Sequence, residues 1–222
     1  MSSRDYYEEL WRSIPVGSQP AQLELRRGFL LGELGRMAGE REEASGSREE
    51  PLRVLDVGCG EGQLTAEIAR AGCRVIGVDV AEEPLRRGRQ RHPGIDLRRV
   101  ELDGQWPLPD AGFDVIWAGE TIEHVAETAR WLSQLRRLLR SGGSLLLSTP
   151  ANGRMELLRL VLSRRRMQEH FDPRSEHLRF YSANSLAELL ADFGFEQISV
   201  RGAGGPAGAR RVLLAAAVRS RF

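Results

Sequence analysis

The sequence contains no lysine. All 32 basic residues among its 222 positions are arginine, and 31 acidic residues balance them, so the formal net charge is +1. The absence of lysine excludes reactions that need a lysine Schiff base or a lysine general base. A net charge this close to zero argues against a strongly basic surface, and therefore against nucleic acid as a partner.

Cysteine and long apolar runs are also scarce. The two cysteines, Cys59 and Cys73, are too few for a disulfide framework, and we expect both to be small buried thiols. No apolar stretch approaches the ~20 residues of a membrane-spanning helix. The first residues, Met1–Tyr7, lack the apolar core of a signal peptide. We therefore expect a cytoplasmic protein without a transmembrane segment.

A glycine-rich loop is the most informative feature that the sequence does contain. Residues 53–62 read RVLDVGCGEG, an apolar run with Asp56 near its end, followed by Gly58, Gly60 and Gly62 at alternate positions. Glycine allows a sharp turn and a close approach of ligand to backbone. The helix expected next, from Gln63, would point its free N–H groups at that ligand. The spacing G-x-G-x-G differs from the G-x-G-x-x-G of dinucleotide-binding loops.

Two further expected strands lead to acidic residues. The strand Cys73–Asp79 ends at Asp79, which is placed to accept hydrogen bonds from both hydroxyls of a ribose. The strand Asp96–Leu102 is followed by Asp103, within reach of an adenine amine. A fourth strand, Phe113–Ala118, is continuously apolar, as expected for a strand that is buried on both faces.

The segments LDVGCGEGQ, VIGVD and FDVIWAGETIEHV, in this order, resemble class I S-adenosylmethionine-dependent methyltransferases, and the resemblance runs over residues 51–218. It implies an α/β fold: a Rossmann-like seven-stranded sheet with a C-terminal antiparallel hairpin and a helical cap insertion over about residues 151–181. Residues 1–50 would form an N-terminal helical lid and linker, and residues 51–222 the cofactor-binding domain. The implied cofactor is S-adenosylmethionine, and the residues expected to hold it are Asp56, Gly58, Gly60, Gly62, Asp79, Val80, Leu102, Asp103 and Gly119.

The string Glu120-Thr-Ile-Glu123-His124 follows the fourth strand, at the edge where open α/β sheets bind ligands. His124 is a candidate general base, with Glu123 to orient it. The same string offers three metal ligands within one helical turn. Small-RNA 2′-O-methyltransferases and ubiquinone-biosynthesis O-methyltransferases carry a similar string, which implies a Mg or Mn site of Glu120, Glu123, His124 and His177. Many metal-free small-molecule methyltransferases also have Glu-His-Val here, so both interpretations stay open.

We therefore predict an S-adenosylmethionine-dependent methyltransferase that acts on the hydroxyl of a small molecule. RNA 2′-O-methylation is the first alternative; N-methylation and a non-catalytic cofactor-binding subunit are the others. Three consecutive arginines, Arg164 to Arg166, lie in the insertion and would attract a phosphate, a carboxylate or a membrane surface. An anionic acceptor is therefore one of the open possibilities.

The other elements follow from apolar periodicity and from capping residues. We expect a mobile linker over Gly39–Pro51, and Ser182 to cap a C-terminal helix. The tripeptide Ser141-Gly142-Gly143 should end the helix before it. The expected helices are Asp5–Trp11, Leu23–Met37, Trp131–Arg140 and Leu186–Phe193, and the remaining strands are Ser144–Thr149, Phe195–Arg201 and Arg211–Val218.

Overall fold

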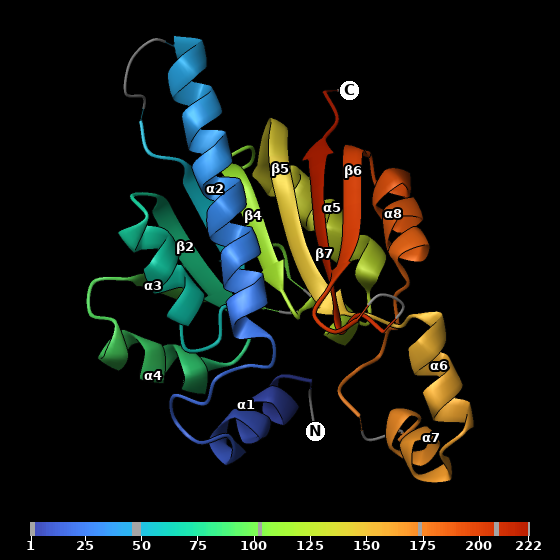
Figure 1. The fold of residues 1–222 in the computed structure, drawn as a ribbon. Helices are drawn as coiled ribbons and strands as arrows, with labels where there is room; N and C mark the ends of the chain where they lie inside the picture. Colours follow the sequence, from blue (N-terminus) through green and yellow to red (C-terminus); the bar gives the residue numbers. More distant parts are fainter. Residues whose placement is uncertain (1–2, 46–49, 102–103, 173–174, 207–208, 222) are drawn as a thin grey trace.

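The computed structural model describes residues 3–45, 50–101, 104–172, 175–206 and 209–221 (Figure 1). The strands are β1 (Arg53–Val57), β2 (Arg74–Asp79), β3 (Asp96–Arg99), β4 (Phe113–Gly119), β5 (Leu139–Pro150), β6 (Phe195–Ala203) and β7 (Val212–Arg219). The helices are α1 (Ser3–Ser13), α2 (Leu23–Ser45), α3 (Gln63–Arg70), α4 (Glu82–Arg91), α5 (Thr128–Leu138), α6 (Arg154–Val161), α7 (Arg164–His170) and α8 (Ala183–Asp192), with a 3₁₀ turn, η1 (Ile122–His124).

The strands form one sheet in the order β3-β2-β1-β4-β5-β7-β6. β1 to β5 pair in parallel, whereas β7 runs antiparallel to both β5 and β6. The predicted Rossmann-like seven-stranded sheet with its C-terminal antiparallel hairpin is confirmed. The order reverses between β1 and β4, and open α/β sheets bind ligands at the carboxyl ends of the strands beside such a reversal.

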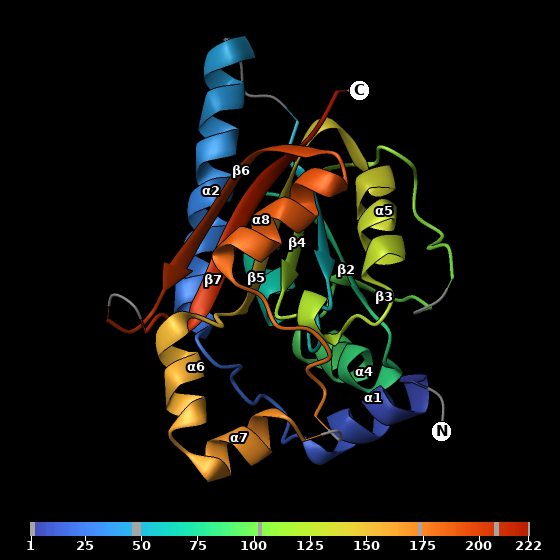
Figure 2. The ribbon, with the colours of Figure 1, turned by 90° about the vertical axis from the view of Figure 1, so that its right-hand side faces the viewer.

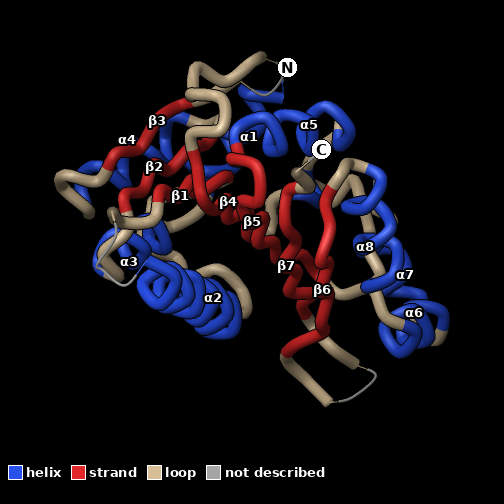
Figure 3. The backbone as a smooth tube through the Cα atoms, turned by 90° about the horizontal axis from the view of Figure 1, so that it is seen from above, coloured by secondary structure: helices blue, strands red, loops and turns tan. Residues whose placement is uncertain are grey.

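Helices cover both faces of the sheet, which explains the apolar central strands (Figure 3). On one face, Leu30 and Leu34 of α2 and Ile68 of α3 share a buried cluster with the strands. On the other face, a larger cluster joins α5 and α8 to the sheet. β4 lies between the two clusters, and its first six residues are all buried.

Three boundaries differ from those expected. α2 continues to Ser45, so the first part of the expected linker is helical; its glutamates and arginines are good helix formers, and Arg36 pairs with Glu40 at 2.7 Å. α5 ends at Leu138. The serine-glycine-glycine tripeptide lies inside β5, at the point where the pairing of β5 with β4 shifts register after Phe113. β3 ends at Arg99, before the expected Leu102. The division of the chain at residue 50 stays a prediction.

The insertion leaves the sheet after β5 and carries α6 and α7 beyond the strand ends (Figures 1 and 2). Ala151 and Tyr181 pair as an isolated bridge, which closes the insertion at its base. Ser182 caps α8, as expected, by accepting a hydrogen bond from the Ser185 N–H. Among the described residues, none of the helices combines the length and the apolar character needed to cross a bilayer.

Candidate active site

The glycine loop connects β1 to α3 and is fastened to β2. Gly58, Gly60 and Gly62 have φ angles of 71°, 54° and 72°, in the left-handed region that favours glycine. The N–H groups of Gly58 and Cys59 both donate to the Val78 carbonyl, at 2.8 and 3.0 Å. A Cβ at Gly58 would lie 2.5 Å from the Thr121 hydroxyl oxygen, so a larger residue there would not fit. Cys59 and Cys73 are free thiols and only partly buried, less so than expected.

Asp79 supports the same loop from the end of β2. Its carboxylate accepts hydrogen bonds from the backbone N–H of Gly60 at 2.9 Å and of Ala81 at 3.0 Å. Burial raises the pKa of Asp79, and these backbone hydrogen bonds oppose the rise. Each carboxylate oxygen has two lone pairs, so both oxygens can still accept a hydroxyl donor from the cavity.

Asp56 lies beneath the loop, away from solvent. Its Oδ2 accepts a hydrogen bond from the Thr65 hydroxyl at 2.6 Å. The pKa of Asp56 is raised to about 7, mainly by burial; the Thr65 hydrogen bond opposes the rise and the neighbouring Asp79 contributes to it. Arg26 of α2 is buried as well, and burial lowers its pKa; the nearby acids Glu120, Glu123 and Asp56 oppose that shift without reversing it. Sequence reasoning missed Arg26 as a buried cation beside the acidic site residues, because a lone arginine in a helix pattern gives no signal that it will be buried there.

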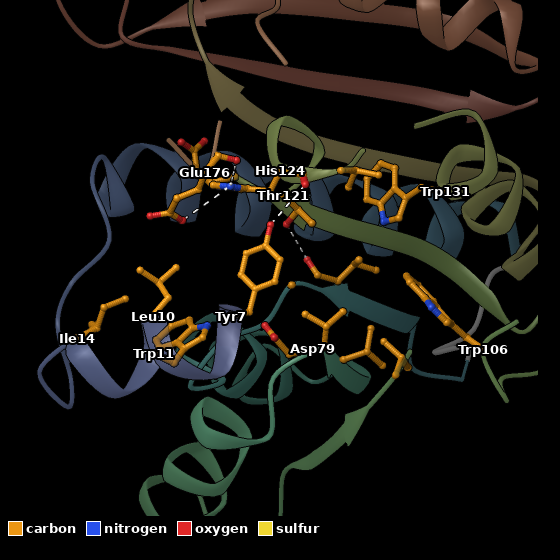
Figure 4. Close-up of a pocket in the computed structure, with 17 residues that line it drawn as sticks. Tyr7, Leu10, Trp11, Ile14, Asp79, Trp106, Thr121, His124, Trp131 and Glu176 are labelled. Atoms are coloured by element: carbon orange, nitrogen blue, oxygen red, sulfur yellow. Dashed lines mark hydrogen bonds and ion pairs between the residues drawn. The ribbon is translucent and has the colours of Figure 1, made fainter. Parts of the chain in front are cut away.

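A cavity of about 200 Å³ opens above the loop (Figure 4). Of the residues expected at the cofactor, Gly58, Asp79 and Val80 line it. Gly60 lies under the ring of Trp11, Gly62 packs on Leu97 and Gly119 lies beside Trp117. Leu102 and Asp103 lie outside the described residues. The apolar part of the lining comes from Leu10, Trp11, Ile14, Val57, Val78, Val100, Trp106, Val125 and Trp131.

Helix α1 forms one wall of this cavity, and polar contacts hold it there. Both carboxylate oxygens of Glu8 accept backbone hydrogen bonds at the N-terminus of α4, from Glu82 at 2.6 Å and from Glu83 at 3.1 Å. Ala81 occupies the N-cap position of α4 but has no side-chain acceptor, so Glu8 of α1 caps α4 in its place. The Tyr7 hydroxyl donates to the His124 carbonyl at 3.4 Å, and burial raises the pKa of Tyr7 to about 12.

Glu120 begins the acidic string in a strained backbone conformation. Its φ angle of 53° is uncommon for a residue with a side chain and often marks a functional site. Ser148 of β5 holds it: the Glu120 N–H donates to the Ser148 carbonyl at 2.9 Å, and the Ser148 hydroxyl donates to the Glu120 carboxylate at 2.8 Å. Glu120 therefore lines the cavity from a fixed position.

The structure brings together Glu123, His124 and His177. One ligand atom from each lies within 4.8 Å of the others. The N–H groups of Leu178 and Arg179 both donate to the Glu123 carbonyl, and this pairing carries His177 from the insertion to His124, with ring centroids 5.0 Å apart. The expected fourth ligand, Glu120, does not belong to this cluster.

The charge states in this cluster follow from burial. Burial raises the pKa of Glu123 to about 8, and Glu120 adds to the rise. Glu123 Oε2 accepts from the Thr149 hydroxyl at 3.0 Å, whereas Oε1 is buried without a hydrogen-bond partner among the described residues. Burial and then His177 lower the pKa of His124, which favours a neutral imidazole. His124 Nδ1 lies 3.0 Å from the Glu176 carbonyl, which can only accept, so Nδ1 carries the proton.

The chain has relatives among known proteins. The family model described as a methyltransferase domain matches residues 29–200. A probable S-adenosylmethionine-dependent methyltransferase of Mycolicibacterium smegmatis is 40% identical over 146 residues, which cover 64% of this chain and 51% of that protein. The ubiquinone biosynthesis O-methyltransferase of Ruegeria pomeroyi is 32% identical over 195 residues, which cover 82% of this chain and 73% of that protein.

A solved structure has the same fold. The magnesium protoporphyrin IX methyltransferase of Synechocystis, with bound S-adenosylhomocysteine, superposes with a TM-score of 0.62 at 21% identity, covering 98% of both chains. The present chain spans about half the length of the mycobacterial relatives that it matches.

Proposed function

The chain belongs to the S-adenosylmethionine-dependent methyltransferases, and on that premise we propose that it methylates a hydroxyl of a small molecule. The observation that carries the proposal is the position of His124 in the wall of the cavity, opposite the glycine loop and Asp79. The name of the Ruegeria relative, an O-methyltransferase, supports a hydroxyl rather than an amine as acceptor.

The cavity fits the cofactor that the family implies. We assign the methionine end to Gly58, Gly60 and Gly62, and the ribose hydroxyls to Asp79, whose free lone pairs face the cavity. The apolar walls suit an adenine ring, and Asp103 would meet its amine. Asp56 either orients the loop or meets the cofactor's ammonium group; Val80, Leu102 and Gly119 complete the set. The cofactor supplies a methyl group on a sulfonium, already activated for transfer.

The protein must then position the acceptor and accept its proton. Because His124 Nδ1 donates to the Glu176 carbonyl, Nε2 is the nitrogen left free to take a proton. Its depressed pKa keeps the ring neutral near pH 7, which a general base requires. Glu123 Oε1 lies 4.0 Å from Nε2 and can orient the imidazole.

A divalent cation fits the same residues as an alternative. The buried Oε1 of Glu123 has no hydrogen-bond partner among the described residues and shares its surroundings with two imidazoles. One carboxylate and two imidazoles suit Mn²⁺, Fe²⁺ or Zn²⁺ better than Mg²⁺. Glu120 is a neighbouring carboxylate that could complete the set. A bound cation would lower the pKa of the acceptor hydroxyl, so that no strong protein base would be needed.

Labelled S-adenosylmethionine offered with a panel of hydroxylated metabolites tests this proposal, run with and without EDTA. Label should appear in a hydroxyl acceptor, and S-adenosylhomocysteine should bind the purified protein. Loss of activity in EDTA, restored by Mn²⁺ or Mg²⁺, would favour the cation; full activity in EDTA would favour His124 as the base. Label found only on amines would contradict O-methylation.

A further inference from the structure

A second cavity, of about 490 Å³, lies beside the first and is lined by cations. We call it the arginine cleft. Its described lining residues include no carboxylate; the cationic and titratable ones are Arg159, Arg166, Arg179, Arg210, Arg211, His170 and His177. They come from α6, α7, the segment before α8 and the β6–β7 connection, so the insertion and the hairpin each supply part of the lining. Figure 2 shows α6 and α7 below the connected ends of β6 and β7.

The arginine cleft opens at the same sheet edge as the cofactor cavity. Pro150, at the end of β5, pairs with Val212 at the start of β7, and the Ala151 N–H donates to the Arg211 carbonyl at 3.1 Å. The two cavities meet at a pair of rings: His124 lines the first, and His177 lines the second. A molecule held in the cleft can therefore extend a hydroxyl toward His124.

Two arginines of the cleft, Arg179 and Arg210, have donors to spare. Arg179 donates to the Ala126 carbonyl at 2.7 Å and Arg210 to the Gly205 carbonyl at 2.8 Å, and carbonyls leave the guanidinium charge uncompensated. Arg165, which precedes Arg166 in α7, differs from the arginines of the cleft. It pairs with Glu169 at 2.8 Å, is 87% exposed and does not line the cleft. The three consecutive arginines of α7 are therefore not equivalent, and Arg166 is the one that lines the cleft.

We propose that the arginine cleft binds a phosphate or diphosphate group of the methyl acceptor and so orients its hydroxyl toward His124. This inference rests on the proposed function, to which it adds the chemical class of the substrate. Guanidinium groups present planar forks that match phosphate oxygens and bind them with two parallel hydrogen bonds. A cleft of about 490 Å³ suits one phosphorylated small molecule rather than a chain of nucleotides.

Calorimetry with inorganic pyrophosphate in about 0.15 M salt tests the cleft directly. Arg166→Ser and Arg211→Ser should each weaken binding about five- to tenfold, because each removes charge-assisted hydrogen bonds. Arg165→Ser is the matched control and should stay within twofold of wild type. All three side chains are exposed, so the substitutions leave the core intact. Equal affinity in all four proteins, or no binding to wild type, would overturn the proposal.

Further arms identify the source of the phosphate. Phenyl phosphate should displace pyrophosphate if the acceptor is a soluble monoester, whereas displacement of pyrophosphate by vesicles of phosphatidic acid but not by phenyl phosphate would assign the site to a lipid headgroup. An oligoribonucleotide that binds far more tightly than pyrophosphate, with the same dependence on Arg166, would overturn the small-molecule assignment. Affinity for S-adenosylhomocysteine is measured separately, so a failure of the proposed function is distinguishable from a failure of the cleft.

Discussion

The cofactor cavity and the arginine cleft lie at one sheet edge but are built in opposite ways. The first has mostly apolar walls, and its polar groups, such as Asp79 and Glu120, are hydrogen-bonded to backbone or to Ser148. The second is lined by five exposed arginines and by no carboxylate among its described lining residues. An apolar cavity with fixed acceptors suits a neutral ring and a ribose, whereas an open cationic site suits a solvated anion.

The difference also concerns where the residues come from. Gly58, Gly60 and Asp79 follow two neighbouring strands and lie within 22 positions of one another along the chain. The cleft instead draws on separate segments between Pro150 and Arg211. The proposed cofactor site thus depends on a local motif, whereas the proposed acceptor site depends on how the insertion packs. The following variants separate the two.

The largest effect is expected at the boundary between the cavities. His124→Ala removes the group that takes the acceptor's proton or holds a cation, so kcat should fall about 10²- to 10⁴-fold. Affinities for S-adenosylhomocysteine and for pyrophosphate should stay within about threefold, since neither ligand depends on this ring for its main contacts. Steady-state kinetics and calorimetry on the same preparation measure both. A kcat within tenfold of wild type would remove His124 from the chemistry.

The pH dependence of stability should include a contribution from Asp56, on the cofactor side. Because the pKa of Asp56 is raised to about 7 in the folded protein, the unfolded state releases this proton first as the pH rises. The free energy of unfolding should therefore fall between about pH 4 and pH 7, by at most roughly 1.4 kcal/mol per pH unit from this group.

Asp56→Asn should flatten that slope, because the amide cannot ionise and can still accept from Thr65. Glu123, whose pKa burial raises to about 8, and Asp79, whose pKa burial also raises, would account for part of the slope that remains. Urea unfolding at several pH values compares the two proteins. Parallel curves would show that Asp56 is ionised in the fold at neutral pH.

Asp79→Ala should weaken the cofactor side alone. The carboxylate is assigned two ribose hydroxyls, and hydrogen bonds to a charged group contribute about 1.5–3 kcal/mol each, so affinity for S-adenosylhomocysteine should fall at least tenfold. Pyrophosphate affinity should not change. Asp96→Ala, at an exposed site on β3, is the control. Unchanged cofactor affinity in Asp79→Ala would remove this residue from the site.

The smallest effect is expected where α1 is fastened to α4. Glu8→Ala leaves the first N–H groups of α4 without their acceptor and should cost about 1 kcal/mol of stability. Cofactor affinity should fall severalfold as the wall of the cavity loosens, with no change at the cleft. Glu9→Ala, at an exposed position on the same helix, should alter neither quantity. If Glu9→Ala has the same effect, the contact with α4 is not what holds α1.

Sequence patterns predicted the succession of strands along the chain and the site motifs, because both depend on residues that are near neighbours in the sequence. Polarity alone misled us at the end of α2, where ion pairs such as Arg36–Glu40 extend a helix that we expected to be a linker. The glycines after α5 predicted the end of a helix, whereas Gly142 lies inside β5, where the pairing with β4 shifts register. His177 was expected beside His124, and the hydrogen bonds to Glu123 bring it there.

By itself, the sequence determined the glycine loop, the acids that follow the strands and the Glu123-His124 pair, since each needs only a strand, a turn and a helix in succession. The tertiary structure decided the rest. It brought Glu8 to the N-terminus of α4, buried Arg26 near the acidic string and separated Arg166 from Arg165. These contacts join segments far apart in the chain, and no local spacing encodes which side chain faces which cavity.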